Sequence, residues 1–404
     1  MARRFLALLR RRPAYRSLWL AELVSMTGDW FSIVAVSVVA LRGPGGGALT
    51  LALALAAHLL PSAFMAPLGG LVADRVDRRK VLLYGNLLEG VLTVGMLLAA
   101  LGRQVAVLTA LVAVRSMCSA AREPASAAAL PRLVATDELE DANALGGFTW
   151  SLAFTLGMGL GGLVTELGPA VAFSLDALSF FGAVALLARL PPIAVDRDDA
   201  PGARGLRLLA RDLKEGLRAA WSPSRRGSVF GHTPVGLVHG AGWLAMNLAA
   251  EHHPLATGGA ATLGFLQAIR GFGTAVGPLG LGASSMPRAV SAHLAVLAFV
   301  LGGVGMALAG SFLTAALAAF AWGCGAGVLW TVLSMEIQAG TEDALRGRMM
   351  ATSGLGFTVS MTVGALLAAL SVEGLGSPTA GVALLAAVTA AGWLSLRGPL
   401  PAVA

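Results

Sequence analysis

The stretch GGLVADRVDRRKVLLYGN, residues 69–86, separates two long apolar runs and decides how the chain is interpreted. It places six charged residues within the seven positions 74–80, in a chain that is 56% hydrophobic and only 13% charged. A soluble protein of 404 residues needs a far larger charged surface. The concentration of charge in one short turn therefore requires an explanation other than solubility.

Long apolar runs recur from one end of the chain to the other. The mean hydropathy is +0.76, and the runs reach the roughly 20 apolar residues that cross a hydrocarbon core of about 30 Å. The sequence therefore predicts an all-α integral membrane protein with twelve transmembrane helices. The expected spans are 17–41, 49–73, 81–101, 104–122, 141–165, 169–190, 229–250, 259–281, 290–309, 312–335, 349–370 and 378–396.

The basic residues predict the orientation of these spans. Lysine and arginine lie at the two termini and in alternate connecting segments, with four exceptions: Arg42, Arg103, Arg115 and Arg270. Because basic loops are retained in the cytoplasm, we expect both termini and the long middle loop there, in a multi-pass protein of the cell membrane. The net charge of +7 is then a topology signal, and no motif indicates a nucleic-acid partner.

A long polar segment over 191–228 divides the expected spans into two sets of six. We expect an N-terminal six-helix lobe over 1–190 and a C-terminal six-helix lobe over 229–404. This is the layout of a two-lobed secondary transporter, whose site lies near the membrane midplane between the lobes. Within the segment, leucines at helical spacing predict an amphipathic helix, which either lies along the membrane or packs on the transporter's own loops. These leucines are Leu206, Leu209, Leu213 and Leu217.

The charged turn has a physical logic of its own. Gly70 allows two helices to touch, and Asp74 suits the positive N-terminal end of a neighbouring helix. Arg78 can pair with an acid at the cytoplasmic end of another span, and Glu123 is the obvious partner. Such a cluster would hold the lobes together on the inner side and break when the cytoplasmic mouth opens. The alternative is a topology anchor, which requires neither Gly70 nor the aspartates.

This turn resembles the signature of the major facilitator superfamily, in which a glycine is followed four residues later by Asp-Arg and then by paired basic residues. In that family the turn contacts the start of span 11, which here carries Arg346 and Arg348. The resemblance implies a cytoplasmic gate. Its expected residues are Gly70, Asp74, Arg75, Arg78, Arg79, Glu123, Arg346 and Arg348.

Further motifs along the chain resemble the subgroup that includes macrolide efflux proteins and the enterobactin exporter. They are GDWF in span 1, RSMCSAAREPASAAALPRLV after span 4, FSLDALSFFGAVALL in span 6, DLKEGLRAAW in the middle loop and LRGRMM before span 11. LGMGLGG in span 5 resembles an antiporter motif, with Met158 at its proline position. The resemblance implies a monomer that exports small molecules through the lipid bilayer by alternating access.

Ionisable residues inside spans are costly and therefore indicate a cavity or a partner. Glu22 and Asp29 are seven residues apart and share a helical face. We favour a pairing of Asp29 with Arg115, because spans 1 and 4 both line the cavity in this fold. A proton-coupled exporter needs a carboxyl group of this kind to take up and release protons. The alternative is that Asp29 and Arg115 form an ion pair with a purely structural role.

Three further residues belong to the predicted substrate and proton pathway. Asp176 in span 6 lies one turn from Ser179, and we favour a structural role for it. Arg270 in span 8 lies among glycines, and it either lines the cavity or extends toward the cytoplasm. Glu22 lies near the inner end of span 1, where it is an entry-side charge.

The remaining patterns limit the function classes. The two cysteines lie in apolar runs, and their separation in the sequence matches neither a disulfide framework nor a metal site. We interpret His252 and His253 as residues of a solvated loop. The sequence contains no nucleotide-binding or catalytic motif, so we expect that the protein is not an enzyme and needs no cofactor. We expect a proton gradient as the driving force. Trp30, Phe31, Phe148, Trp150, Phe154 and Trp243 either line an apolar drug pocket or anchor the packing.

The leading interpretation is proton-driven export of small amphipathic or hydrophobic compounds, such as antibiotics, siderophores or secondary metabolites. One alternative is an importer or uniporter of a small solute. Another is a non-transporting membrane receptor that keeps the fold, in which Asp74 and Arg78 would be replaceable without consequence.

Overall fold

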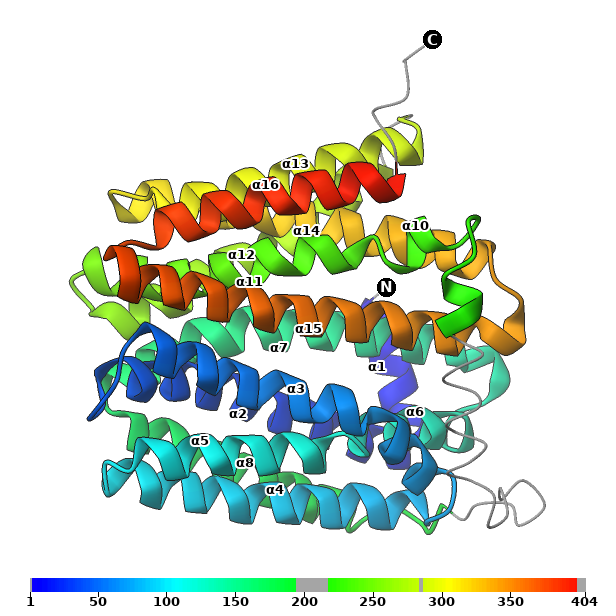
Figure 1. The fold of residues 1–404 in the computed structure, drawn as a ribbon. Coiled ribbons are helices and arrows are strands. Elements are labelled where there is room, and N and C mark those ends of the chain that lie inside the picture. Colours follow the sequence, from blue (N-terminus) through cyan, green and yellow to red (C-terminus); the bar gives the residue numbers. More distant parts are fainter. Residues whose placement is uncertain (1, 194–216, 283–285, 398–404) are drawn as a thin grey trace. The chain divides into compact units, whose positions relative to one another are not determined.

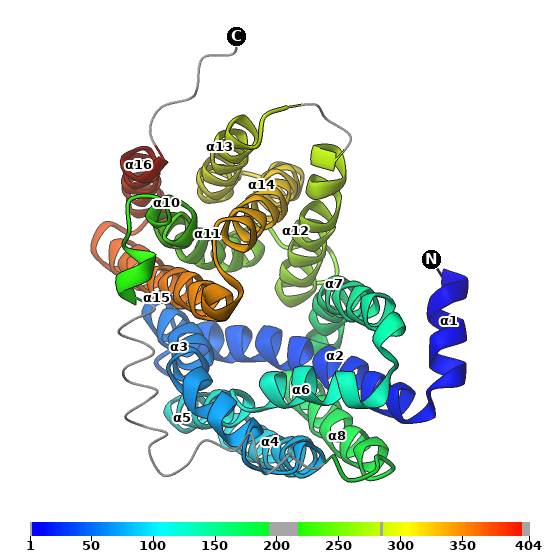
Figure 2. The ribbon, with the colours of Figure 1, turned by 90° about the vertical axis from the view of Figure 1, so that its right-hand side faces the viewer.

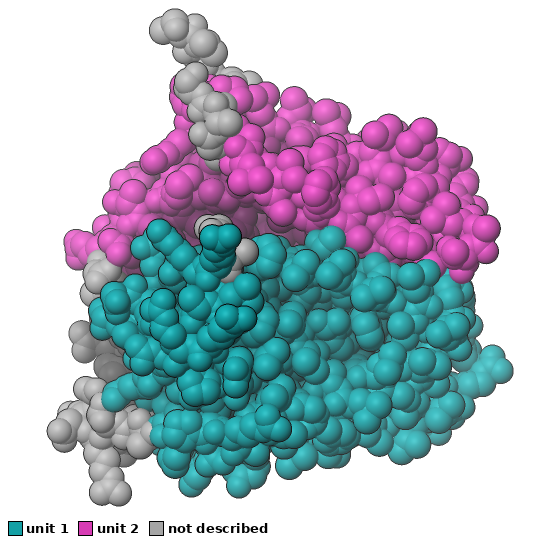
Figure 3. Space-filling view, turned by 180° about the vertical axis from the view of Figure 1, so that it is seen from behind, with its two compact units in different colours: residues 1–45, 57–205 teal, residues 46–56, 206–404 magenta. Residues whose placement is uncertain are grey.

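The computed structural model describes residues 2–193, 217–282 and 286–397. Helices form nearly all of this part of the chain (Figure 1). The chain divides into two compact units: residues 1–45 with 57–205 form unit 1, and residues 46–56 with 206–404 form unit 2 (Figure 3). The first residues of α3 therefore cluster with unit 2, and the rest of this helix clusters with unit 1.

Unit 1 is a bundle in which α8 packs against both α2 and α4, and α2 also packs against α7. Phe173 and Phe180 on the buried face of α8 are fully enclosed, and Asp176 lies between them on the same face. The described elements of the N-terminal half are α1 Ala2–Arg11, α2 Pro13–Arg42, α3 Ala48–Ala73, α4 Arg78–Leu101, α5 Val105–Ser119, α6 Arg122–Leu133, η1 Thr136–Glu138, α7 Leu139–Glu166 and α8 Pro169–Leu187.

Unit 2 is built around α11 and α14. α11 packs against α13, α15 and α16, and α14 packs against α12 and α13. Trp322 on α14 and Phe299 on α13 are buried at the centre, with ring centroids 6.0 Å apart. The described helices of this half are α10 Arg226–Val229, α11 His232–His252, α12 Gly259–Gly282, α13 Arg288–Ala307, α14 Phe312–Ala339, α15 Asp343–Leu375 and α16 Pro378–Arg397.

A helix lies at each span that the sequence predicts. Among the described residues, ten helical segments are long and apolar enough to cross a membrane, which makes this a multi-pass membrane protein. The predicted number of twelve is not confirmed, because α11 and α12 are not among the ten. α11 carries His232, His239 and Asn247, and α12 carries Gln267 and Arg270. These polar residues lower the hydropathy of both helices.

The segment 122–140, predicted as a connecting loop, is largely helical. α6 follows α5 after a break at Ala120–Ala121, and the two helices together are counted as one candidate span over Val105–Leu133. The N-terminal residues also form a helix, α1, whose Leu8 and Leu9 are buried and which packs against α2 and α7. Arg12 follows α1 and forms an ion pair of 2.7 Å with Glu138. The amphipathic helix expected at 206–217 lies almost wholly outside the described residues.

The close contact predicted at Gly70 lies one residue earlier in the structure. A Cβ atom at Gly69 would overlap the carbonyl oxygen of Ala120, where α5 ends. A Cβ atom at Gly70 would meet nothing within 4 Å. Within unit 1, Gly69 and not Gly70 faces the neighbouring backbone, and a role of Gly70 in a contact between the units stays a prediction.

Replacing each glycine in turn tests which of the two positions is closely packed. Gly69→Ala forces a methyl group onto a backbone carbonyl, and overpacking of this kind costs about 1–3 kcal/mol. We expect a lower melting temperature for purified Gly69→Ala and a wild-type value for Gly70→Ala. Equal melting temperatures for the two variants would contradict the packing described here.

Candidate functional site

α2 and α8 approach closely along a stripe of small residues on α2. Ser25, Gly28 and Ser32 are buried and recur at helical spacing. A Cβ atom at Gly28 would overlap the hydroxyl of Ser179 and lie 2.6 Å from Oδ1 of Asp176. The glycine therefore allows α2 to come within reach of the polar side chains on α8.

Arg115 and Asp176 form the most buried ion pair of unit 1. Their Nη1 and Oδ2 atoms are 2.7 Å apart, and the side chain of Asp176 is completely enclosed. The hydroxyl of Ser32 donates to the same carboxylate oxygen, and Arg115 also donates to Thr93 Oγ1 at 3.2 Å. The guanidinium lies 5.7 Å from the ring centre of Phe180. Each of these contacts compensates for the loss of water around two buried charges.

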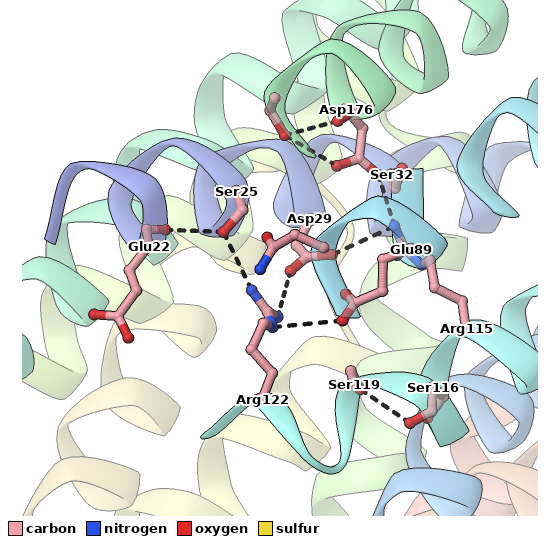
Figure 4. A network of polar contacts seen from close by, with 12 residues as sticks. Glu22, Ser25, Asp29, Ser32, Glu89, Arg115, Ser116, Ser119, Arg122 and Asp176 are labelled. Carbon is pink, nitrogen blue, oxygen red and sulfur yellow. Dashed lines mark hydrogen bonds and ion pairs between the residues drawn. The ribbon is translucent and has the colours of Figure 1, made fainter. Parts of the chain in front are cut away.

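Asp29 lies between two arginines (Figure 4). Its Oδ1 is 3.4 Å from Nη1 of Arg115, and its Oδ2 is 3.1 Å from Nη2 of Arg122. The structure thus brings Asp29 and Arg115 together, as the sequence predicts. Asp29 keeps 24% of its side chain accessible, whereas Asp176 has none. Of the two aspartates, Asp29 is therefore the more accessible.

Glu89 on α4 completes a group that we call the buried ionic cluster. Its Oε1 is 3.6 Å from Nε of Arg122 and makes no hydrogen bond, although only 1% of the side chain is exposed. The cluster comprises Asp29, Glu89, Arg115, Arg122 and Asp176 (Figure 4). Three carboxyl groups thus face two guanidinium groups, which leaves one carboxyl group without a matching positive charge.

Glu22 lies next to this cluster but does not join it directly. Its carboxylate accepts a hydrogen bond from the hydroxyl of Ser126 on α6. Ser25 connects the two regions, because its hydroxyl oxygen accepts from Arg122 at 3.2 Å and lies 3.4 Å from the carbonyl oxygen of Glu22. The polar network therefore continues from the cluster along α2 toward the start of this helix.

The predicted pathway lacks two residues of the cluster, Glu89 and Arg122. Arg122 stands at the very end of the predicted span 104–122, where a basic residue indicates a cytoplasmic boundary. A usable signal was present: Arg115 and Arg122 are seven residues apart, as are Glu22 and Asp29. Seven residues make two helical turns, so each pair lies on one face of its segment. Matching the two spacings would have predicted both arginines opposite the acids of α2.

In unit 2, Arg270 lies in the interior of the bundle. Only 6% of the residue is exposed, and its Nε donates to Gln267 Oε1 at 2.8 Å. The guanidinium lies 5.1 Å from the ring of Trp243 and 5.2 Å from that of Trp322. This burial contradicts the alternative in which Arg270 extends toward the cytoplasm, since aromatic rings surround the charged group.

Three of the aromatic residues singled out in unit 1, Trp30, Trp150 and Phe154, form a cluster. Trp30 packs edge-on against Phe154 with centroids 4.7 Å apart, and Trp150 stacks on Phe154 at 5.6 Å. Trp150 and Phe148 expose 47% and 56% of their surface. This arrangement provides an apolar, aromatic surface on α7 together with packing to α2.

The charged turn at 74–80 is joined to the end of α8. The side chain of Asp77 caps α4 by accepting from the backbone N–H of Lys80 at 3.3 Å. Arg79 donates from Nη2 to the carbonyl oxygen of Ala188 at 2.8 Å. A cation at the C-terminal end of a helix is stabilised by the helix dipole. Arg79 therefore has a local role within unit 1.

The other gate residues of unit 1 are at its surface or partly buried. The backbone N–H of Arg78 donates to the carbonyl oxygen of Ile193 at 3.1 Å. Asp74 and Arg75 are exposed. Glu123 is exposed in the first turn of α6, where an acid is favourable. The pairing of Arg78 with Glu123 remains a prediction.

Arg346 and Arg348 belong to α15 in unit 2. The Nε of Arg346 donates to the carbonyl oxygen of Gln338 at 3.0 Å, which ties the start of α15 to the end of α14. A contact between these arginines and the turn at 74–80 would join the two units. It therefore also remains a prediction.

Long apolar helices with ionic residues buried among them define a polytopic membrane protein. Residues 5–404 match a major facilitator family model described as a transmembrane secretion effector, and the chain therefore belongs to this family of membrane transporters. No curated protein sequence matches the chain.

Solved structures with a similar fold include the nucleoside transporter NupG, with a TM-score of 0.73 at 13% identity over 95% of this chain and 98% of that one. A POT family transporter in complex with 5-aminolevulinic acid matches with a TM-score of 0.71 at 14% identity over 95% of each chain. A structure from a study of proton dependent oligopeptide transporters matches with a TM-score of 0.68 at 13% identity, also over 95% of each chain. These likenesses show that the chain has the major facilitator fold.

Removing the charge of Asp176 tests the structural part of the cluster. Asp176→Asn leaves Arg115 without its closest counter-ion, and breaking a buried pair from one side costs about 3–5 kcal/mol. We expect a strong loss of the folded monomer peak and of thermal stability in detergent. Asp137→Asn, at an exposed position in η1, is the matched control and should behave as wild type. An unchanged melting temperature for Asp176→Asn would contradict this assignment.

Proposed function

We propose that this transporter exports small amphipathic or hydrophobic compounds, such as antibiotics, siderophores or secondary metabolites, and that proton entry drives export. The observation that carries the proposal is the buried ionic cluster, in which three carboxyl groups face two guanidinium groups. An unmatched carboxylate in an apolar interior is unfavourable. One proton on the cluster removes the excess negative charge, and release of this proton restores it.

Asp29 is the group that exchanges this proton with water in our proposal. It is the more accessible of the two aspartates that contact Arg115, and it touches both arginines. Protonation of Asp29 removes its attraction for Arg115 and Arg122. Arg115 then stays paired with Asp176, and Arg122 can move closer to Glu89, whose Oε1 is 3.6 Å from its Nε. A change of protonation is thereby converted into a change in the packing of α2 against α5 and α6, which alternating access requires.

The direction and substrate class rest on three arguments. The family is described as a transmembrane secretion effector, and the sequence resembles drug and siderophore exporters in several motifs. The aromatic surface of Trp30, Trp150 and Phe154 suits an apolar compound. In this proposal the protein is a monomer in the cell membrane with both termini in the cytoplasm, and the turn at 74–80 is the cytoplasmic gate.

Accumulation assays in a pump-deficient bacterium test the proposal. We expect lower accumulation of at least one labelled macrolide, siderophore or dye in cells with the protein, and a protonophore should abolish this difference. Asp29→Asn should raise accumulation to the level of cells without the protein, because it removes the carboxyl group on which the proposed proton coupling depends. Asp29→Glu keeps a carboxyl group and should retain part of the export, and Asp137→Asn should export normally.

Three outcomes would contradict the proposal in different ways. Export that survives the protonophore, or wild-type export by Asp29→Asn, would remove the proton-coupling role. Higher accumulation in cells with the protein would identify an importer or uniporter. Correctly inserted protein without an effect on any compound would favour the receptor alternative.

A further inference from the structure

A cavity of about 640 Å³ opens at one end of unit 2. The helix ends that surround it belong to α10, α13, α14 and α16, and Figure 2 looks onto this end of the unit. Its lining contains three arginines, Arg225, Arg288 and Arg397, but among the described lining residues only one acid, Glu336. The cavity therefore carries excess positive charge.

The single acid of the cavity is already engaged. Glu336 forms a two-point ion pair with Arg397, with N–O distances of 2.5 and 2.7 Å. The guanidinium of Arg397 also lies 5.4 Å from the ring of Trp393, which fixes the pair against α16. Arg225 is held at the rim by a 3.4 Å contact from its Nε to the carbonyl oxygen of Gly340. The positive charge of Arg225 and Arg288 is left facing the cavity.

Further donors suit an oxyanion at this place. Arg288 and Ala289 are the first residues of α13, so the positive end of a 20-residue helix lies at the cavity wall. Ser224 and Ser228 add hydroxyl groups from the opposite side. The paired N–H donors of the guanidinium groups and the N–H groups of the helix end together match the geometry of a phosphate group.

The position of the cavity favours a lipid headgroup over a free anion as its ligand. α13 begins here, and α14 and α16 end here, so the cavity lies where membrane helices leave the hydrocarbon, at the level of the headgroups. The two helices α13 and α16 also carry exposed apolar side chains. They are Leu294, Leu297 and Leu301 on α13, and Leu384, Val388 and Leu394 on α16.

We propose that this cavity is a binding site for the phosphate headgroup of an anionic phospholipid, whose acyl chains lie along the exposed leucines of α13 and α16. The lipid bridges α10, α13, α14 and α16 and stabilises unit 2. Basic pockets between helix ends are suited to such headgroups, because a fixed phosphate satisfies several guanidinium groups at once.

Native mass spectrometry of the full-length protein tests the site. Dioleoylphosphatidylglycerol is titrated against the wild type and against Arg225→Gln/Arg288→Gln, with dioleoylphosphatidylcholine and inorganic phosphate as separate arms. We expect the double variant to bind phosphatidylglycerol about thirtyfold more weakly, from two lost charge contacts. Phosphatidylcholine binding should be equal in both proteins. Inorganic phosphate alone should bind far more weakly than the anionic lipid.

The matched control is Arg218→Gln/Arg226→Gln, which removes the same charge from two exposed arginines nearby that do not line the cavity. It should bind phosphatidylglycerol as the wild type does. Arg225→Lys/Arg288→Lys should recover most of the binding, and both glutamine variants should melt as the wild type does without anionic lipid. Equal weakening by the two glutamine variants, or no weakening by Arg225→Gln/Arg288→Gln, would overturn the site. Phosphate binding as tight as lipid binding would overturn the lipid assignment.

Discussion

A guanidinium group placed in the apolar interior of unit 1 has to be matched by anions and hydrogen-bond acceptors, and the packing of the unit follows from this requirement. Arg115 is 5% exposed and reaches Asp176 on α8, Asp29 on α2 and Thr93 on α4. Three helices therefore converge on one side chain of α5. Gly28 makes this possible, because a larger residue would keep α2 away from α8.

The need to match buried cations with anions also bears on the charge balance of the buried ionic cluster, which has three carboxyl groups and two guanidinium groups. Arg122 adds a second cation, and Glu89 adds a third carboxyl group with an oxygen that makes no hydrogen bond. A purely structural network would be most stable with equal numbers of opposite charges. An odd carboxyl group gives the cluster two states that differ by one proton, and this property links the packing of unit 1 to the proposed transport cycle.

The sequence predicts the helices well, because long apolar runs have few alternatives in a membrane. It also predicts that Asp29 and Arg115 meet, since both are charged and both lie inside spans. It could not predict that Asp176 would be the closest partner of Arg115, because this depends on how tightly α2 and α8 approach. It could not place Arg122 in the cluster, because the predicted span ends at this residue, whereas in the structure a second helix, α6, begins there. Gly69 and Gly70 are adjacent, and only the rotation of α3 decides which of them faces α5.

Infrared difference spectroscopy of the purified protein tests most directly whether the buried ionic cluster carries a proton. The cluster of the wild type should give the carbonyl band of a protonated, buried carboxyl group at neutral pH. The intensity of this band should be lost or redistributed in Glu89→Gln and Asp29→Asn and retained in Asp137→Asn. A wild-type spectrum without any band of a protonated buried carboxyl group would mean that all three acids are ionised, which would contradict the account.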